Sequence, residues 1–400
     1  MQRRSFLKNI PLASASLWLP RFLQAQAQPG LLRPNGKILV MLQLSGGNDG
    51  LNTLAPISND IYYRERPRIA IDPKEALRLT EHAGLHPALT TLRKWYDNGH
   101  LAVLNSVGYP NPDRSHFRSM DIWHTGSPAD EYWSQGWLGR YLDAQCGEQC
   151  PRATGALEID DTLGLALKGA QNNGLALQNP QRLYEMAHSA YFEDYAAANA
   201  NIAAPDDHPV GYLYKTMRDA LSSADYLLER SKAKTARGNY PDSELGRHLQ
   251  TIASLISADA DTSVYYVSHG SFDTHVNQEG QHKRLFEDMN QSLEAFAATL
   301  QEQGRWQDVL VVTFSEFGRR VAQNASNGTD HGAANLMFFA GGGLKKSGIL
   351  NGMPDLSQLT DGDLPYEIDF RRVYATLLEN WLGVDAKAVL GGEFGRLGFV

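Results

Sequence analysis

Apolar runs of strand length recur along the chain, and most of them end in a polar turn. One is Val309-Leu310-Val311-Val312-Thr313, in which β-branched residues follow one another without a polar interruption. A continuous run of this kind is typical of a strand buried on both faces of a sheet. Comparable runs occupy residues 37–44, 101–108, 263–267 and 336–340.

Segments with helical apolar spacing separate these runs, which predicts an α/β sheet with helices on both faces. Residues 154–168 fit two short strands around Asp160-Asp161, and residues from about 180 to 258 are mostly helical in pattern. Further helices are expected at Leu85–Trp95, after Ser115, at Glu279–Gln303 before Gly304, and from Asp369 to Trp381.

The N-terminus predicts export. Arg3-Arg4 with Ser5, Phe6, Leu7 and Lys8 matches the twin-arginine pattern, and Ala25-x-Ala27 offers the small residues that a signal peptidase needs. The stretch between them is too short, and too interrupted by prolines, to span a membrane. We therefore expect a signal peptide at residues 1–27, the twin-arginine translocase as a partner, and a mature protein in the periplasm or secreted, outside the membrane.

A linker rich in proline and glycine is expected at residues 28–36, before a single domain at residues 37–400. By length alone the mature chain fits two domains. One domain is preferred because the polar turns lie far apart in sequence, yet each follows a strand. The helical block at about 180–258 is then an insertion or a flank of the sheet.

The charge balance excludes a dedicated nucleic-acid binder. The chain has 37 basic and 45 acidic side chains, and removing Arg3, Arg4, Lys8 and Arg21 with the signal leaves 33 against 45, a net charge of −12. A nucleic-acid binder would show a basic face. An anionic substrate is still compatible, because a bound cation inverts the local field.

The two cysteines, Cys146 and Cys150, are too few and wrongly spaced for a zinc knuckle. In an oxidising compartment they can close a local disulfide, although two free thiols fit the sequence equally well. Neither alternative makes them catalytic.

Acidic and imidazole side chains follow four of the predicted strands. In parallel sheets such turns meet at the carboxyl edge, where ligands bind. Oxygen ligands with imidazole suit Zn²⁺, Mn²⁺, Mg²⁺ or Ca²⁺, and the imidazoles favour the transition metals. The candidate ligands are Asp49, Asp273, His275, Glu316, Asp330 and His331.

Ser115 and His116 open the helix that follows the second strand. The serine hydroxyl is either an attacking nucleophile or an ordinary helix cap, and the sequence favours neither. His116 joins it as a candidate catalytic residue. Arginines near these turns are candidates to hold an anionic ester group or to pair with carboxylates: Arg114, Arg118, Arg319 and Arg320.

Several motifs resemble a family of twin-arginine-exported bacterial proteins, a domain of unknown function grouped with the alkaline phosphatase and sulfatase superfamily. The resemblance covers nearly all of the mature chain and implies an alkaline-phosphatase-like, three-layer α/β/α sandwich with a mostly parallel sheet. The motifs are KILVMLQLSGGNDGLNT, YPNPDRSHFRSMDIWHTG, GWLGRYLD, FDTHVNQ, VTFSEFGRRVAQN and GTDHG.

The resemblance implies roles for individual residues. Asp49 matches the first-strand metal ligand, Ser115 the nucleophile, Asp273 with His275 a ligand pair, and His331 a late ligand. Where the superfamily has Asp-His-Gly, this chain has Glu316-Phe317-Gly318, so Phe317 replaces a ligand histidine. A second metal is then weakly held or absent, unless His116 or Asp330 substitutes. The Ser115-His116-Phe117-Arg118 sequence does not match the motif of sulfatases.

Two functions fit these observations. The first is an exported metal-dependent hydrolase of phosphate or related anionic esters, attacked by Ser115 or by water. The second is a non-catalytic periplasmic protein that keeps the fold to bind an envelope polymer or a secreted partner, as the loss of a ligand at Phe317 suggests. An oxidoreductase is disfavoured because no nucleotide fingerprint or haem motif is present.

Overall fold

The computed structural model describes residues 35–146, 150, 153–190, 192, 194 and 209–400. The predicted signal peptide at residues 1–27 lies outside these ranges, as does most of the predicted linker at residues 28–36. Within the described part of the chain, no helix is long and apolar enough to cross a bilayer.

The largest element is a central sheet. Its strands are β1 (Ile38–Leu44), β5 (Leu101–Gly108), β6 (Ala156–Glu158), β7 (Leu175–Ala176), β8 (Val264–His269), β9 (Val309–Phe314), β10 (Asn335–Ala340), β11 (Gly348–Ile349) and β12 (Ile368–Asp369). Their order is β11-β5-β10-β9-β1-β8-β6-β7, with β12 beside β5. Only the two pairings of β10 are antiparallel among these strands, so the predicted mostly parallel sheet is confirmed.

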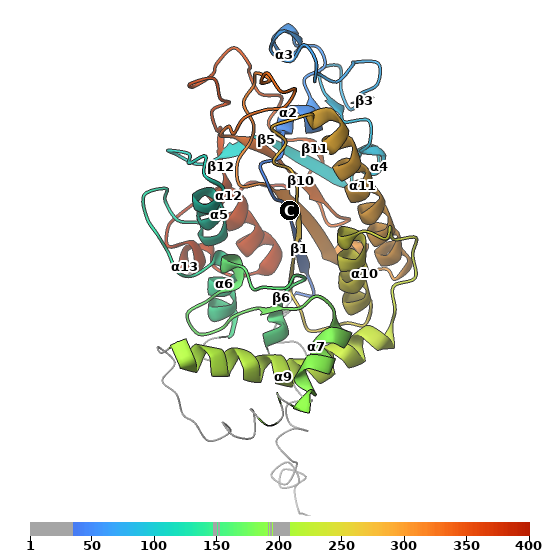
Figure 1. Ribbon diagram of the computed structural model, residues 1–400, viewed down its shortest axis with the longest axis vertical. Helices are drawn as coiled ribbons and strands as arrows, with labels where there is room; N and C mark the ends of the chain where they lie inside the picture. The colour runs from blue at the N-terminus through green and yellow to red at the C-terminus, as the bar shows by residue number, and fades with distance from the viewer. Residues whose placement is uncertain (1–34, 147–149, 151–152, 191, 193, 195–208) are drawn as a thin grey trace, which may run out of the picture.

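Helices cover both faces of this sheet (Figure 1). One face carries α4 (Thr90–Asp97), α10 (Glu244–Ser257) and α11 (Gln278–Glu302), and the other carries α5 (His116–Thr125), α6 (Trp137–Cys146), α12 (Phe370–Thr376) and α13 (Ala386–Leu390). Successive β1 residues alternate between two buried cores, with Ile38 and Val40 in one and Leu39 and Met41 in the other. The predicted three-layer α/β/α arrangement is therefore confirmed.

The remaining elements lie around this sandwich. The predicted helical block contains α7 (Pro180–Ala187) and α9 (Pro209–Ala233) besides α10, and α12 continues as a π-helix, η6 (Leu377–Leu382). A small second sheet pairs β2 (Leu54–Ala55), β4 (Gly84–Leu85) and β3 (Leu77–Arg78), beside the short helices α2 (Gly50–Thr53) and α3 (Asp60–Glu65). Short 3₁₀ turns occur at η3 (Ala153–Gly155), η4 (Leu165–Leu167) and η5 (Trp306–Asp308).

Two of the predicted elements differ from the structure. The helix expected from Leu85 begins at Thr90, because Gly84 and Leu85 pair in the small sheet. The window 154–168 contains one strand, β6, rather than two. Its apolar second part forms the turn η4 against α6, where the Gly136 amide donates to the carbonyl of Lys168. Helix packing thus replaces strand pairing in that segment.

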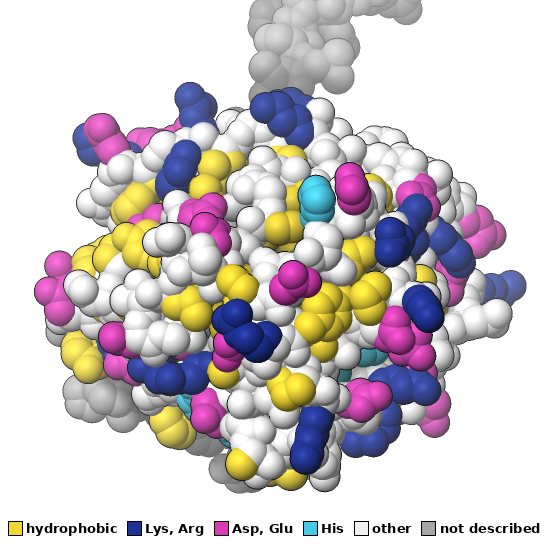
Figure 2. All heavy atoms as spheres, turned by 90° about the horizontal axis from the view of Figure 1, so that it is seen from above, with side chains coloured by type: hydrophobic (Ala, Val, Ile, Leu, Met, Phe, Trp, Pro, Cys, Tyr) yellow, Lys and Arg dark blue, Asp and Glu magenta, His cyan; other side chains and the backbone are white. Residues whose placement is uncertain are grey.

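The sheet order decides where the polar turns meet. Strand β1 lies between β8 and β9, and all three are parallel, so their carboxyl ends share one edge. Helix α2 follows β1 directly and lies at the upper end of the molecule in Figure 1. Seen from that end, acidic and basic side chains are interspersed, and apolar side chains gather near the centre of the face (Figure 2).

Candidate metal centre

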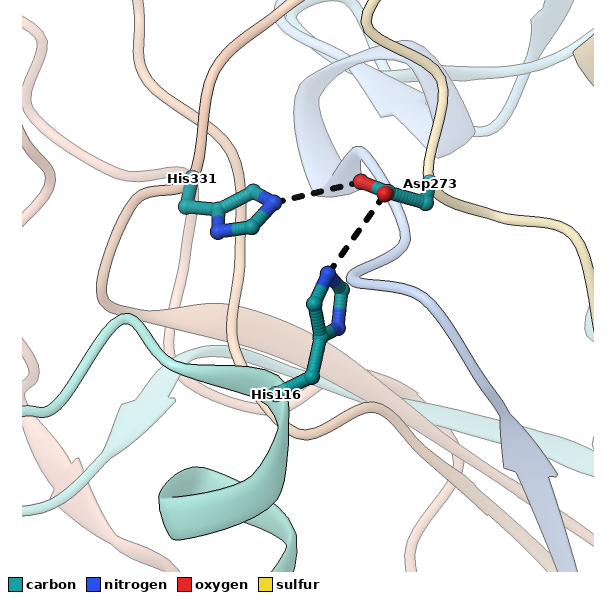
Figure 3. A group of neighbouring side chains, drawn as sticks. All are labelled: His116, Asp273 and His331. Atoms are coloured by element: carbon teal, nitrogen blue, oxygen red, sulfur yellow. Dashed lines mark hydrogen bonds and ion pairs between the residues drawn. The ribbon is translucent and has the colours of Figure 1, made fainter.

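Three side chains from separate segments converge at the carboxyl edge of the sheet (Figure 3). His116 is the first residue of α5, Asp273 follows β8, and His331 lies in the loop between β9 and β10. His331 Nε2 is 3.1 Å from Asp273 Oδ1, and His116 Nε2 is 3.5 Å from Asp273 Oδ2. The three ligand atoms lie within 4.8 Å of one another, so they form a group able to hold a metal ion. We call these three residues the metal cluster.

His275 borders the metal cluster. Its Nε2 is 2.9 Å from His331 Nε2 and 3.1 Å from Asp273 Oδ1. Its other ring nitrogen, Nδ1, is 3.1 Å from Asp330 Oδ1. Asp330 therefore contacts His275, and Asp330 is not among the grouped ligands. Asn324 donates to Asp330, which lowers the pKa of this exposed carboxyl below its ordinary value.

Each of the three imidazoles has its Nδ1 beside an acceptor. The carbonyl oxygen of Arg114 is 2.8 Å from His331 Nδ1, and Glu316 Oε1 is 2.9 Å from His116 Nδ1. Glu316 Oε1 also accepts the Gly46 amide, and Asp330 Oδ1 also accepts from Asn324, so both oxygens are acceptors. The neutral rings therefore carry their protons on Nδ1 and present a lone pair at Nε2.

This tautomer is the one that metal-binding histidines use, with the second ring nitrogen donating to a carboxylate or a carbonyl. In the neutral state three Nε2 lone pairs then face one another and an ionised carboxylate, with no imidazole proton between them. A cation is needed there, either a metal ion or a proton on one ring. Ligand atoms on tetrahedral Zn²⁺ lie about 3.3 Å apart, close to the 3.1 and 3.5 Å that separate Asp273 from His331 and His116, so the donor set fits a metal.

Arg319 fixes the carboxylate of the metal cluster. Its buried guanidinium donates to Asp273 Oδ1 at 2.7 Å. It also donates to the carbonyls of Gly46, Gly47, Phe272 and Thr329, which belong to three different loops. Burial raises the pKa of Asp273, but the hydrogen bond and the charge of Arg319 outweigh it, so the net pKa is below the ordinary value. Of the two roles that the sequence left open for Arg319, the structure shows the pairing with a carboxylate.

The aromatic side chain of Phe317 packs against the metal cluster. Phe317 is buried, and its ring centroid lies 4.5 Å from that of His331 and 4.9 Å from that of His116. It also fills the space beside Gly47, where a Cβ atom would lie 2.2 Å from the Phe317 ring. Phe317 therefore forms an apolar wall that holds the two imidazoles.

Besides His275 and Asp330, two further predicted ligands lie outside the metal cluster. Asp49 is fully buried, and its Oδ2 accepts from Arg66 and Gln278, each at 2.6 Å, while Oδ1 caps α2 through the amide of Leu51. Burial raises the pKa of Asp49, but the charge of Arg66 outweighs it and the net pKa is lowered. Arg66 supplies there the positive charge that we had expected from a metal.

Glu316 is the second of these. Its carboxylate is buried and accepts from His116 Nδ1 and from the Gly46 amide. It thus orients a ligand imidazole instead of joining the group. The sequence predicted a carboxylate at this edge, but it did not show that His116 would lie between Glu316 and Asp273.

The candidate catalytic residues on α5 differ in what they contact. Ser115 is exposed and occupies the N-cap position without forming a side-chain capping bond. Asp113 Oδ1 accepts the Ser115 amide instead. Arg118 is buried, donates to the carbonyls of Pro128, Ala129 and Glu131, and stacks on Tyr132. Its guanidinium therefore binds a neighbouring loop, and its role in substrate binding stays a prediction.

Arg114 and Arg320 are half-exposed, and both approach one buried carboxylate, Asp363. Arg114 forms an ion pair with Asp363 Oδ2, and Arg320 Nε lies 3.7 Å from Asp363 Oδ1. Two positive charges thus share one negative charge, and the backbone carbonyl of Arg114 accepts from His331.

A family model described as "Protein of unknown function (DUF1501)" matches residues 100–397. The match spans most of the chain and contains every residue of the metal cluster. The chain belongs to this family. No curated protein matches it.

Solved structures resemble this DUF1501 member only distantly. Lipoteichoic acid synthase LtaP from Listeria monocytogenes has a TM-score of 0.39 and 11% identity, covering 88% of this chain and 72% of that one. The phosphonate monoester hydrolase SpPMH from Silicibacter pomeroyi has a TM-score of 0.40 and 10% identity, covering 90% and 76%. The sulfatase PsFucS1 from Pseudoalteromonas sp. has a TM-score of 0.38 and 12% identity, covering 94% and 72%. Similarity this distant assigns no activity to this chain.

Sequence reasoning missed two residues of this DUF1501 member that fix the site. Arg66 neutralises Asp49, and Asp363 holds Arg114 and Arg320. Both lie in loops without periodic pattern, and each partner is distant in sequence. An arginine or aspartate in such a loop carries no signal of its contact. The two cysteines, left open above, form the disulfide Cys146–Cys150.

Proposed function

We propose that this protein is an exported, metal-dependent hydrolase of phosphate esters or related anionic esters. One observation carries the proposal: His116, His331 and Asp273 present acceptor atoms to one point, with each imidazole fixed in the tautomer that binds a metal. The disulfide suits an oxidising compartment, in agreement with twin-arginine export.

The residues of the metal cluster would hold the ion, and two imidazoles with one carboxylate favour Zn²⁺ or Mn²⁺ over Mg²⁺ or Ca²⁺. A divalent cation at this point supplies Lewis acidity, which stabilises negative charge on an ester oxygen in the transition state. Phe317 and Arg319 keep the ligands oriented from either side.

Ser115 is the proposed nucleophile. It lies between Arg114, whose carbonyl binds His331, and His116, which belongs to the metal cluster. Its hydroxyl is exposed and does not cap α5, so it is available to attack. Arg114 and Arg320 are proposed to bind the non-bridging oxygens, because one carboxylate leaves a positive charge in excess.

The test is hydrolysis of generic phosphomonoesters, phosphodiesters and sulfate esters, each across a series of Zn²⁺, Mn²⁺, Mg²⁺ and Ca²⁺. We expect turnover of at least one class that depends on added metal. His331→Ala should abolish it, and Ser115→Ala should lower kcat by roughly 100-fold or more, because an activated nucleophile is lost. His82→Ala is the matched control, since it removes an exposed histidine outside the metal cluster.

No turnover with any metal, in protein shown to be folded, would contradict the proposal. If Ser115→Ala turns over substrate at an unchanged rate, the role of the metal is retained and water, rather than Ser115, is the nucleophile.

The second candidate function is a binder without catalysis. It is favoured by Phe317, which fills the place of a superfamily ligand, and by the ion pair that engages Arg114. Its partner would be an envelope polymer or a secreted protein. Protein that binds metal but hydrolyses none of the three ester classes would support the binder.

A further inference from the structure

Exposed apolar side chains are concentrated on the segments that build the candidate site. Among the described residues, six large hydrophobic side chains are exposed: Phe117, Tyr132, Met186, Val276, Leu359 and Tyr366. Of these six, only Met186 belongs to an element at the lower end of the molecule, α7 (Figure 1). Each of the other five belongs to, or packs against, a segment that carries His116, His275 or Asp363. We call these five residues the apolar rim.

The most exposed member of the apolar rim is Phe117. It directly follows His116 of the metal cluster and comes two residues after Ser115, the proposed nucleophile. Its side chain is 88% exposed, although it stands in the first turn of α5. The next residue, Arg118, stacks on Tyr132, which is 79% exposed, with 3.9 Å between the guanidinium carbon and the ring centroid. The first turn of α5 thus joins the metal cluster to two exposed aromatic rings.

The other members accompany the remaining polar groups of the site. Val276 directly follows His275, which borders the metal cluster. Leu359 and Tyr366 lie on either side of Asp363 in the chain, and Asp363 is the carboxylate that approaches both half-exposed arginines. Apolar side chains therefore accompany the imidazoles and the ion pairs, although they belong to separate segments of the chain.

This distribution has a functional meaning. Single apolar side chains are normal on a protein surface, but a group of them around one site marks a place where something binds. The site is open to solvent, since the side chains of Asp273 and His275 are 45% and 39% exposed. Apolar side chains also gather near the centre of the face in Figure 2, with acidic and basic ones around them. The part of a ligand that extends beyond the metal would therefore rest on an apolar surface.

We propose that the apolar rim binds an apolar group of the substrate, so that the site takes anionic esters carrying an alkyl or aromatic group. The metal cluster and the two arginines would bind the anionic end, and Phe117 with the other rim residues would remove the apolar end from water. The inference rests on the proposed function, because it names the class of ester that the same site takes.

The test is calorimetry of zinc-loaded protein with phosphonates, whose P–C bond is not an ester bond. The probes are phenylphosphonate, hexylphosphonate and hydroxymethylphosphonate, which share the charged group and differ in the group attached to it. We expect at least one of the two apolar probes to bind at least tenfold more tightly than the polar one. A preference for the phenyl or for the hexyl probe shows which apolar group the rim takes. Equal affinities, or no binding of any probe, would overturn the proposal.

The variant Phe117→Ala tests whether the contact is direct. It should remove most of the preference for the apolar probes and leave the affinity for hydroxymethylphosphonate unchanged, because it retains the metal ligands. Met186→Ala is the matched control, an exposed apolar residue on α7, and it should bind all three probes as the wild type does. Equal weakening of all three probes in Phe117→Ala would mean that Phe117 acts through His116, and would overturn its role in binding.

Other occupants of the apolar rim would give different results. If the protein co-sediments with phosphatidylcholine vesicles and shows no preference among the probes, the apolar rim binds a lipid surface and the proposal is overturned. Self-association that Phe117→Ala abolishes, again without a preference, would assign the rim to a second copy of the chain and overturn it too. A preference without turnover of any ester contradicts the hydrolase and retains the apolar rim as a ligand site, whereas turnover without a preference does the reverse.

Discussion

Hydrogen-bond partners on the far side of each ring orient the imidazoles of the candidate centre. A carbonyl, a glutamate and an aspartate each accept one Nδ1 proton, from His331, His116 and His275 in turn. Three neutral rings fixed in this way turn their lone pairs toward Asp273. The residues that contact the ligands from outside are therefore as diagnostic as the ligands themselves.

Glu316→Gln tests this arrangement at a single residue. The amide still accepts a hydrogen bond, but it lacks the negative charge that the carboxylate places beside the ring of His116. We expect metal affinity, measured by competition with a chelating dye, to fall about 10–100-fold with the fold retained. Asp330→Asn is the matched change on His275, which lies outside the metal cluster, and it should have a smaller effect. Equal losses in the two variants would place His275 among the ligands.

Individual contacts were the part that the sequence predicted least well. His116, Asp273 and His331 could be selected because each follows a strand of the predicted sheet. Asp49 met the same criterion, yet Arg66 neutralises it. Nothing in the spacing of Asp49 and Arg66 indicates an ion pair, because a loop without periodicity does not fix where its side chains point.

At the scale of elements, the turn after β1 joins the loops of the site. Gly46 has a φ of +117°, and a Cβ atom on it would lie 2.4 Å from the Asp273 amide nitrogen. Only glycine lets the backbone of this turn approach the Asp273 loop so closely. The motif Ser45-Gly46-Gly47, weak evidence of function by itself, thus has a steric reason.

Gly46→Ala should be severely destabilising. The backbone conformation costs about 1–3 kcal/mol, and the overpacking against Asp273 adds about 1–3 kcal/mol. Gly304→Ala is the control, because Gly304 has a φ of +67° but no atom within 4 Å of the added Cβ. Urea denaturation should show a larger loss for Gly46→Ala, together with loss of metal binding. Equal losses of stability in the two variants would mean that the close approach to Asp273 adds nothing to the cost of the substitution.

At the scale of the whole molecule, the pattern of apolar runs predicted the layers and the mostly parallel sheet. Both features follow from burial, because the apolar sequence of each strand indicates that the strand is buried. The division of residues 154–168 was wrong because α6 packs against Leu165–Leu167 where a paired strand was expected. Such a choice depends on tertiary contacts that local pattern does not contain.

The free energy of unfolding should depend on pH through the titration of one buried acid. Burial raises the pKa of Glu158, at the end of β6, to about 7 from an ordinary value of 4.5. The folded protein therefore binds a proton that the unfolded chain releases between these values, and stability falls as pH rises from about 4.5 to 7. Glu158→Gln should remove this loss and stabilise the protein by at most about 3 kcal/mol at pH 8.

The measurement is urea denaturation of both proteins at pH 4 and pH 8. The two should be similar in stability at pH 4, where the wild-type carboxyl is protonated in both states. Glu158→Gln that is no more stable than wild type at pH 8 would contradict the raised pKa.

We propose that His116, Asp273 and His331 together hold a divalent metal. The most direct test of this proposal is the metal content of purified protein, by elemental analysis after equilibration with Zn²⁺ or Mn²⁺ and removal of free ions. We expect at least one tightly bound ion per chain in the wild type, and its loss in His331→Ala but not in His82→Ala. Folded wild-type protein that retains no metal, or His331→Ala that retains as much as wild type, would contradict it.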